Sequence, residues 1–317
     1  MTEFNKRVFG CVLVKSINSN YNADFSHQPR TLPNGVVYAT DKALKFAIKN
    51  LLKKEYPEKK ILYFKQLKDD FIPMSLEEAY SAMDFENKKM DKTSVAKNLL
   101  SCLDVRLFGA TFAMKGKIKE ENVAISIHGP VQINHGINIW KENNIFSEQI
   151  SAPFRNAGEK NEENEATTLG RQSKLQEGHY LHHFSINPKN LRNIISAAGG
   201  GQSLSEEDIE SLKIAMRTAV TYYDSAQKAG TDNEMLIWVQ LKENSKRLLP
   251  NFTQLVTMDK QDGAVIYDLG KLKRVLEEND SEVEAVEIYY LPETVELKNF
   301  PTSKTKRFDI NSGKEIQ

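Results

Sequence analysis

The run RVFGCVLVK (Arg7–Lys15) is almost wholly apolar and rich in valine, which is typical of a strand buried on both faces. The polar stretch Asn18–Gly35 follows it, with four asparagines and two prolines, and is too irregular for a helix or a strand. Asp41–Glu55 is then predicted to be a helix, with Thr40 or Asp41 as its cap and Pro57 beyond its end. Its apolar stripe consists of Leu44, Ile48, Leu51 and Leu52.

Four later segments extend this pattern. Val123–Ile133 alternates like a strand until Gly129–Pro130, which predicts a bulge or an edge. His179–Ile186 and Glu234–Glu243 are predicted strands, and Ser205 begins a helix with Asp208 placed for a capping box. The inner face of that helix would carry Ile209, Leu212, Ala215, Met216 and Ala219. The order β–α–β–β–α–β predicts an α+β, ferredoxin-like fold, which is also the plan of the RNA-recognition module.

Two long insertions separate these elements. Pro57–Asn122 has helical segments of its own, such as Thr93–Phe108, and is predicted to form a subdomain. Asn134–Gly178 is poor in apolar residues and carries the acidic run EKNEENEATTLGRQ (Glu159–Gln172), which predicts a long mobile hairpin or loop. Beyond the last core strand we expect one more strand, Ala285–Leu291, and a polar end that frays.

The composition excludes several classes of protein. The 317 residues include 43 Lys and Arg and 43 Asp and Glu, so the chain is not a uniformly basic DNA-coating protein. The two cysteines, Cys11 and Cys102, are too few for a disulfide scaffold or a cysteine-rich zinc site. No run of 18 apolar residues and no cleavage-site pattern is present, so we expect no membrane span and a cytoplasmic location.

Positive charge is concentrated on the first helix. Lys42, Lys45, Lys49 and Lys53 are spaced by three, four and four residues, so they form one stripe along the helix. The segment 41–65 holds eight lysines against three acids. The stripe is either a solvated helix face or a binding surface for phosphates.

Catalytic and metal-binding patterns are weak. His179 and His183 share a predicted strand face but lie about 13 Å apart, too far to bind one ion. His128 and His135 flank the Gly-Pro break, but no acid in that segment completes a metal site. The sequence contains no nucleophile elbow, and the glycine-rich AAGGGQSLS lacks the ending of a P-loop, so it is predicted to link two helices. A metal-independent ribonuclease stays open, because it needs only a histidine and a base.

Six segments, taken together and in order over residues 5–245, are similar to a known family. They are HQPR with YATDKALKFAIKNLL (27–52), DVRLFGA (104–110), ISIHGPVQINHGINI (125–139), TTLGRQSKLQEGHYLHHFSINPKNL (167–191) and SEEDIESLKIAMRTA (205–219), together with the asparagine-rich loop before HQPR. They resemble the Cas-seven family, the backbone subunit of CRISPR type I interference complexes (Cascade), and within it the type I-B, Hmari-like branch.

The resemblance implies a ferredoxin-like palm with large insertions that form fingers and a thumb. The palm would comprise 1–56, 123–133 and 179–317 with a C-terminal extension, the fingers 57–122 and the thumb 134–178. Copies of the chain would polymerise along a guide RNA, with each thumb folded over the RNA of the next copy. The subunit would display the guide for pairing with target DNA, and would be a scaffold without a cofactor, a metal or nuclease activity. Its further partners would be other subunits at the filament ends and a recruited helicase-nuclease.

The resemblance also implies which residues contact RNA. They are Asn20, Arg30, Lys42, Lys45, Lys49, Arg106, His128, Gln132, Phe154, Thr168, Arg171 and Lys174. Two of them carry an alternative, because Arg106 could be a buried anchor of the fold and Phe154 the hydrophobic anchor of the thumb instead of its wedge.

The sequence departs from the family at two places. The early loop NSNYNADFSHQPR (18–30) lacks the family's glycine, and AMRTAVTYYD (215–224) has Arg217 near the place of a family aromatic. Two other functions are therefore weighed against the guide-RNA scaffold. One is a ribonuclease of the same superfold that acts on guide or target RNA, and the other is a protein-interaction scaffold without RNA.

Overall fold

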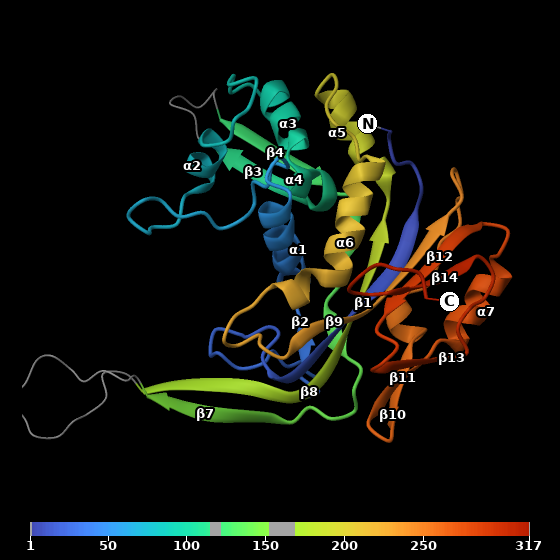
Figure 1. Cartoon of the computed structure of the whole chain (residues 1–317). Helices are drawn as coiled ribbons and strands as arrows, with labels where there is room; N and C mark the ends of the chain where they lie inside the picture. The colour runs from blue at the N-terminus through green and yellow to red at the C-terminus, as the bar shows by residue number, and fades with distance from the viewer. Residues whose placement is uncertain (1, 115–121, 152–168, 317) are drawn as a thin grey trace, which may run out of the picture.

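The computed structural model of the chain describes residues 2–114, 122–151 and 169–316 (Figure 1). It is an α+β fold dominated by one large, mostly antiparallel sheet. None of the helices in the described part of the chain is long and apolar enough to cross a membrane.

Nine strands of the described residues form the main sheet. In spatial order, the strands along its path are β14 (Thr305–Asp309), β12 (Val283–Tyr290), β9 (Thr231–Leu241), β1 (Val8–Ser19), β8 (Leu169–Ile186), β6 (Gly136–Asn138) and β2 (Tyr38–Ala39). Two more, β5 (Val131–Ile133) and β7 (Ile145–Ser151), also pair with β8. The four predicted core strands thus lie in the order β9–β1–β8–β5, each antiparallel to its neighbour.

The central strand β1 is covered on both faces, as its unbroken apolar run predicts. Its residues alternate between two cores, with Val12 in one and Cys11 and Leu13 in the other. Gly10 lies where the backbone of β9 and the ring of Phe184 come closest, because an added Cβ would stand 2.1 Å from the Ile237 carbonyl oxygen. A side chain at this position would force the central strands apart.

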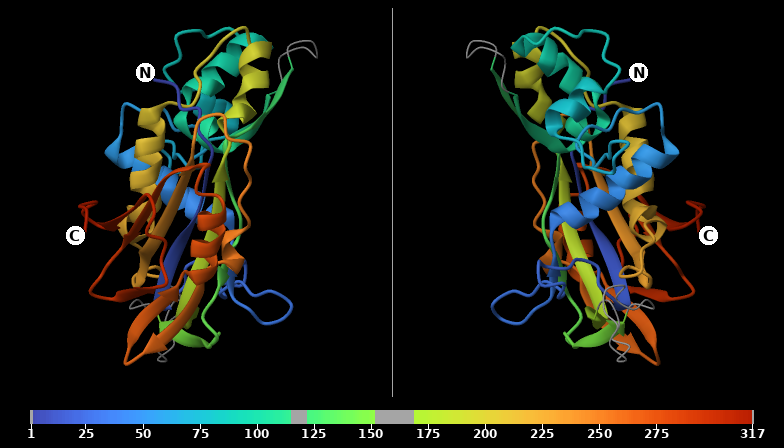
Figure 2. Two further views of the ribbon diagram at one scale, coloured as in Figure 1. Left: turned by 90° about the vertical axis from the view of Figure 1, so that its right-hand side faces the viewer. Right: turned by 90° about the vertical axis from the view of Figure 1, so that its left-hand side faces the viewer.

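Helices α1 (Asp41–Glu55) and α6 (Glu206–Tyr222) pack against one face of the sheet, as the side views of Figure 2 show for α6. The predicted capping box of α6 is confirmed, since Ser205 Oγ accepts from the Asp208 amide at 3.1 Å and Asp208 accepts from the Ser205 amide at 3.2 Å. All five predicted inner-face residues of α6 are buried. Helix α1 begins and ends as predicted, with Thr40 as its N-cap.

The first long insertion and the strand that follows it form a lobe that shares one apolar core with β1, α1 and α6. It contains α2 (Leu76–Ser81), α3 (Lys92–Ser101), α4 (Leu103–Phe108) and a two-stranded sheet of β3 (Gly109–Met114) and β4 (Val123–His128). The helix predicted over Thr93–Phe108 is two helices, because Cys102 has an extended backbone between them.

The strand predicted over Val123–Ile133 is also two strands, which belong to different sheets. The first, β4, pairs with β3 in the lobe, and only β5 joins the main sheet. The chain changes sheets at Gly129, where an added Cβ would lie 2.1 Å from the Phe108 carbonyl carbon. Gly109 faces it with a φ of 76°, so two backbones cross here at a distance that no side chain would permit.

The second insertion forms a hairpin. Strand β7 pairs with the first seven residues of β8, from Ile145 opposite Leu175 to Ser151 opposite Leu169. We call this part of the hairpin, 145–151 with 169–175, the arm. Figure 1 shows the arm and the α2–β4 lobe at opposite ends of the sheet, both directed to the left of the view. Of the two predicted forms, hairpin or loop, the described part of Asn134–Gly178 has the hairpin, and β8 includes the end of the acidic run from Leu169 onward.

The glycine-rich segment connects two helices, as predicted. A short 3-10 turn (Pro188–Leu191) leads into α5 (Arg192–Ala197), and the segment then runs from α5 to α6.

The C-terminal third covers the other face of the main sheet. A 3-10 turn (Phe252–Gln254) leads to a three-stranded sheet of β10 (Thr257–Gln261), β11 (Ala264–Asp268) and β13 (Val295–Lys298), with α7 (Gly270–Glu278) beside it. The predicted strand Ala285–Leu291 is β12. The expected fraying of the polar end is wrong as far as Ile316. Phe308 bridges to Glu315, and the Asp309 amide donates to the Lys314 carbonyl oxygen at 2.9 Å.

Candidate nucleic-acid interface

The lysine stripe of α1 is only partly available to a ligand. Lys42 is exposed, whereas Lys45 is half-buried and forms an ion pair with Asp41 at 2.9 Å. Lys49 Nζ donates to the Tyr63 carbonyl oxygen at 2.7 Å, and burial lowers its pKa. Lys53 Nζ lies 5.5 Å from the centre of the Phe64 ring. The inner lysines therefore fasten α1 to the segment that follows it, and the free charge of the stripe is at its N-terminal end.

The loop between β1 and β2, residues 20–37, lies against the arm. Asn20 is buried, and its Nδ2 donates to the Ser173 carbonyl oxygen at 3.1 Å. Gln28 Nε2 donates to Ser173 Oγ at 2.6 Å, so both ends of the turn 20–28 are attached to β8. Within the described residues, Asn20 Oδ1 and Arg30 Nε are buried without a hydrogen-bond partner. One acceptor and one donor beside this turn therefore lack a hydrogen-bond partner among the described residues.

The arm presents its two predicted cations on opposite faces. Lys174 forms an ion pair with Glu148 across the hairpin at 3.1 Å. Arg171 is exposed and makes no ion pair with any residue that the structure describes. Because side chains alternate along a strand, Arg171 points to the same face as Ser173, which is the face that carries loop 20–37. The predicted residues Phe154 and Thr168 lie outside the described part of the chain.

His128 and Gln132 lie in the segment that leads from the lobe into the main sheet. Both are exposed, His128 at the end of β4 and Gln132 in β5, where its Nε2 donates to the Gly129 carbonyl oxygen at 2.8 Å. His135, on the loop that follows, is 3.7 Å from the Asp41 carboxylate. The short segment 128–135 therefore reaches the N-terminal end of α1.

A continuous series of contacts joins these places. Asn22 Oδ1, in loop 20–37, accepts from the backbone amide and the hydroxyl of Thr40, both at 2.9 Å. Helix α1 begins at the next residue, and Lys45 on its first turns lies 5.6 Å from the centre of the Phe108 ring. Phe108 adjoins Gly109, which pairs with His128. The series therefore leads from the arm, through the loop and the start of α1, to His128.

The sequence of the chain also allows a comparison with known protein families. Residues 6–284 match the family model described as CRISPR-associated protein Cas7. The chain belongs to this family.

Two solved structures are similar to this Cas7-family chain over nearly its whole length. One is a chain of a "CRISPR RNA-guided surveillance complex, pre-nicking", with a TM-score of 0.58, 12% identity and 96% of each chain covered. The other is a chain of a "CRISPR RNA-guided surveillance complex", with a TM-score of 0.50, 12% identity, and 92% of this chain and 95% of that chain covered. At this identity the likeness concerns the fold. A search of curated proteins finds no match.

Arg106 is not part of the exposed surface of this Cas7-family chain. Its side chain is 7% exposed and binds the 3% exposed carboxylate of Asp208. The two hydrogen bonds measure 3.1 Å from Nε and 2.9 Å from Nη2. This bidentate geometry favours the alternative in which Arg106 anchors the lobe to α6.

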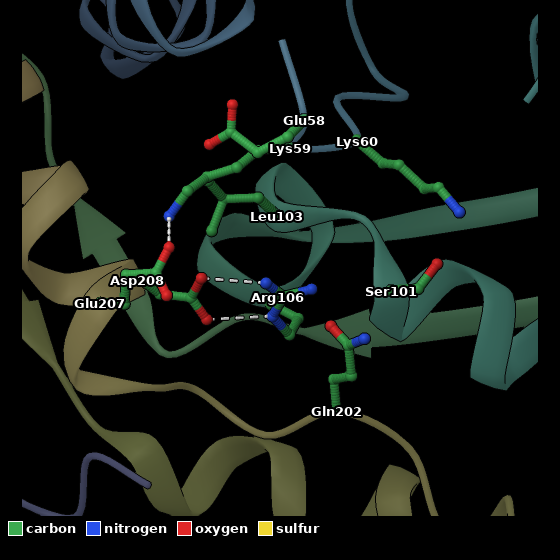
Figure 3. A pocket seen from close by; sticks show the side chains of 9 residues that line it. All are labelled: Glu58, Lys59, Lys60, Ser101, Leu103, Arg106, Gln202, Glu207 and Asp208. Carbon is green, nitrogen blue, oxygen red and sulfur yellow. Dashed lines mark hydrogen bonds and ion pairs between the residues drawn. The ribbon is translucent and has the colours of Figure 1, made fainter. Parts of the chain in front are cut away.

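A cavity of 270 Å³ opens beside this ion pair (Figure 3). Its charged side chains are Glu58, Lys59, Lys60, Arg106, Glu207 and Asp208. Each cation already has a partner, since Lys59 pairs with Glu207 at 3.0 Å and Lys60 donates to the Asp84 carbonyl oxygen. The three cations of the lining are balanced by its three acids, so the cavity offers a phosphate no net positive charge.

Sequence reasoning missed a buried polar cluster between β8, β9 and the C-terminal sheet. His179 lies 2.6 Å from the Glu234 carboxylate and 3.0 Å from that of Glu177, and the Tyr267 hydroxyl donates to Glu234 at 2.6 Å. No group of three or more His, Cys, Asp or Glu within the described ranges is arranged to hold a metal ion. Because His179 and Glu234 belong to the main sheet and Tyr267 to β11, the cluster joins the two sheets. The alternation of residues 179–186 indicates which way His179 faces, but not which partners it meets.

Arg217, which lies near the place of a family aromatic, contacts the C-terminal part of the chain. Its guanidinium donates to the carbonyl oxygen of Asn311 at 2.8 Å and also to that of Ile310. It therefore holds the end of the chain against α6.

Proposed function

We propose that the chain is a guide-RNA-binding backbone subunit of a type I CRISPR interference complex, of the type I-B branch. Copies polymerise along the guide, bind its phosphates and display its bases for pairing with target DNA. The observation that carries the proposal is the series of contacts from the arm to His128, in a chain of the Cas7 family. Other subunits bind at the filament ends, and a helicase-nuclease is recruited to the complex.

The parts of the molecule take their roles from this proposal. The order β9–β1–β8–β5, with α1 and α6 on one face, supports a ferredoxin-like palm. The α2–β4 lobe corresponds to the fingers, with its boundary at Gly129 because β4 pairs within the lobe. The hairpin that contains the arm corresponds to the thumb.

The proposed RNA contacts follow from exposure and charge. Lys42 and Arg171 are exposed cations and bind phosphates, assisted by Lys45 and Arg30. His128 and Gln132 lie along the guide, and Lys174 acts in the thumb. Asn20 shapes the loop that carries Arg30, and Lys49 positions α1. Contacts of this kind carry no sequence information, as a subunit that must accept any guide requires.

A matched pair of double variants tests the interface. Lys42→Glu with Arg171→Glu removes two exposed cations from the proposed RNA surface. Lys54→Glu with Lys271→Glu makes the same change in charge on exposed residues elsewhere. For the first pair we expect weaker RNA binding and a salt dependence shallower by roughly 0.7 in log–log slope for each lost phosphate contact. Equal losses in both pairs, measured by fluorescence anisotropy with single-stranded RNA over a range of salt, would contradict the proposed surface.

The ribonuclease alternative has a separate test. Guide RNA and target RNA incubated with the protein, with and without added metal, should keep their length. A cleavage product that disappears in the His128→Ala variant would replace the scaffold with the ribonuclease.

A further inference from the structure

Phe25 stands at the tip of the turn 24–28 in loop 20–37, and its side chain is 99% exposed. Single exposed apolar side chains are common on protein surfaces, so exposure alone indicates no function. What distinguishes Phe25 is the combination of a braced backbone, a fixed attachment to the arm and unmatched polar groups beside it.

The backbone around Phe25 is held by hydrogen bonds on both sides. Asp24 Oδ1 accepts from the amides of Ser26 at 2.8 Å and Gln28 at 3.0 Å. The Asp24 amide donates to the Gln28 carbonyl oxygen at 2.8 Å, and Ala23 bridges to Pro29. The Asp24 carboxylate is therefore engaged within the turn, and the ring is carried by a fixed backbone.

The turn is attached to the face of the arm that carries Arg171, which forms no ion pair with the described residues. Gln28 and Asn20 both bind Ser173, and Arg171 lies two residues along the same strand on the same face. Arg30, two residues after Gln28, makes no ion pair among the described residues, and its Nε has no hydrogen-bond partner there. The loop that carries the ring and the strand to which it is attached thus each have an arginine that forms no ion pair among the described residues.

These surroundings favour a nucleobase over a protein as the partner of the ring. The neighbours of Phe25 in the turn are Asp24, Ser26, His27 and Gln28, so the turn itself adds no apolar side chain beside the ring. A protein contact is normally built around an apolar patch, with polar residues at its rim. A base needs only the face of one aromatic ring, and cations nearby to bind the adjoining phosphates.

We propose that Phe25 is a stacking platform for one base of the single-stranded RNA, with Arg30 and Arg171 on the flanking phosphates. This inference rests on the proposed function and adds to it a residue that would set the position of a nucleotide on each subunit. Stacking accepts every base, because each base has an aromatic face, so the platform suits guides of any sequence.

Three variants of the full chain test the platform with a single-stranded RNA oligonucleotide of mixed sequence. In Phe25→Ala and Phe25→Leu we expect RNA affinity to fall by about 5- to 150-fold, because neither side chain offers an aromatic face. In Phe25→Trp we expect wild-type affinity and quenching of the new indole fluorescence when RNA is added. Phe71→Ala is the matched control, because Phe71 is also a highly exposed phenylalanine, at 83%, but lies in the lobe.

The outcomes separate this inference from the function on which it rests. If the wild type binds RNA while Phe25→Ala binds equally well and Phe25→Trp is not quenched, the platform is wrong and the proposed function stands. If the wild type does not bind RNA, both are wrong. An emission change in Phe25→Trp that follows protein concentration without RNA would assign the ring to a contact between copies and overturn the platform.

Discussion

The junction of the lobe with α6 and the junction of loop 20–37 with the arm both join segments far apart in the sequence, but their chemistry differs. The first is the buried, bidentate ion pair of Arg106 and Asp208. The second consists of neutral hydrogen bonds that meet at Ser173, from Asn20, Gln28 and Ser147. In the first junction the charges satisfy each other, and in the second no charge takes part.

The difference shows how a chain can hold its parts together and still offer charge to a ligand. An arginine in a buried bidentate pair is out of reach of a phosphate and its charge is already compensated, and removing its partner leaves an unpaired buried charge. Neutral side chains around Ser173 fix the loop while Arg30 and Arg171 stay free of ion pairs among the described residues. The proposed RNA surface therefore adjoins the neutral junction.

The largest expected effect belongs to the ion pair. Arg106→Ala should lower the free energy of unfolding by about 3–5 kcal/mol, because Asp208 stays buried without its partner. Urea unfolding followed by circular dichroism measures this. Lys6→Ala is the control, since it removes the more exposed pair with Glu284 and should lower the free energy by about 0.2–1 kcal/mol. Equal losses in the two variants would mean that the buried pair contributes no more to the free energy of unfolding than the exposed pair.

A pH effect of intermediate size is expected where loop 20–37 meets the turn 225–230. Lys228 donates to the Tyr21 carbonyl oxygen, and burial lowers its pKa to about 8. The unfolded chain therefore binds more protons than the folded chain from about pH 8 up to the ordinary lysine pKa of about 10.4. Stability should rise with pH across this window, by up to about 1.4 kcal/mol per pH unit from this group.

Comparison with Lys228→Met isolates this contribution from other groups that titrate in the same window. The variant should lack the rise, so the difference in unfolding free energy between the two proteins should change with pH between 8 and 10. A constant difference would show that Lys228 keeps an ordinary pKa in the folded protein.

The smallest expected effect belongs to the neutral junction. Ser173→Ala removes the acceptor of Gln28 Nε2 and the partner of Ser147, and should lower the free energy of unfolding by about 1 kcal/mol. Hydrogen exchange should accelerate in the turn 24–28 and stay unchanged around Arg106. Ser147→Ala, which leaves the Gln28 bond in place, serves as its control. Equal acceleration at both junctions would mean that they are not independent.

The sequence predicted the elements whose local pattern is strong. The apolar run of β1, the stripe of α1 and the capping box of α6 each lie within a few residues, and the structure has all three. Arg106 and Asp208, by contrast, are brought together by packing across 102 residues, and no local pattern indicates this.

Two further features depended on tertiary contacts. The first six residues of β8, 169–174, are mostly polar and pair with β7 but not with β1, so they lack the alternation that identified residues 179–186. The lysine stripe has helical spacing whether its members face solvent or, like Lys49, a carbonyl oxygen of a neighbouring segment. Spacing alone therefore places the lysines on one face of the helix, but it does not show whether each amine is exposed to solvent or hydrogen-bonded within the protein.

The central position of β1 has a consequence for synthesis of the chain. Val8 pairs with Ile186 on one side and with Gln240 on the other, so β1 is synthesised well before either of its neighbours exists. At the usual 5–20 residues per second this delay is roughly 10–40 s. During that time the apolar segment β1 is an unpaired strand, exposed to other nascent chains. Slowing translation before residue 186 should therefore increase aggregation, and a chaperone that binds extended apolar segments should reduce it.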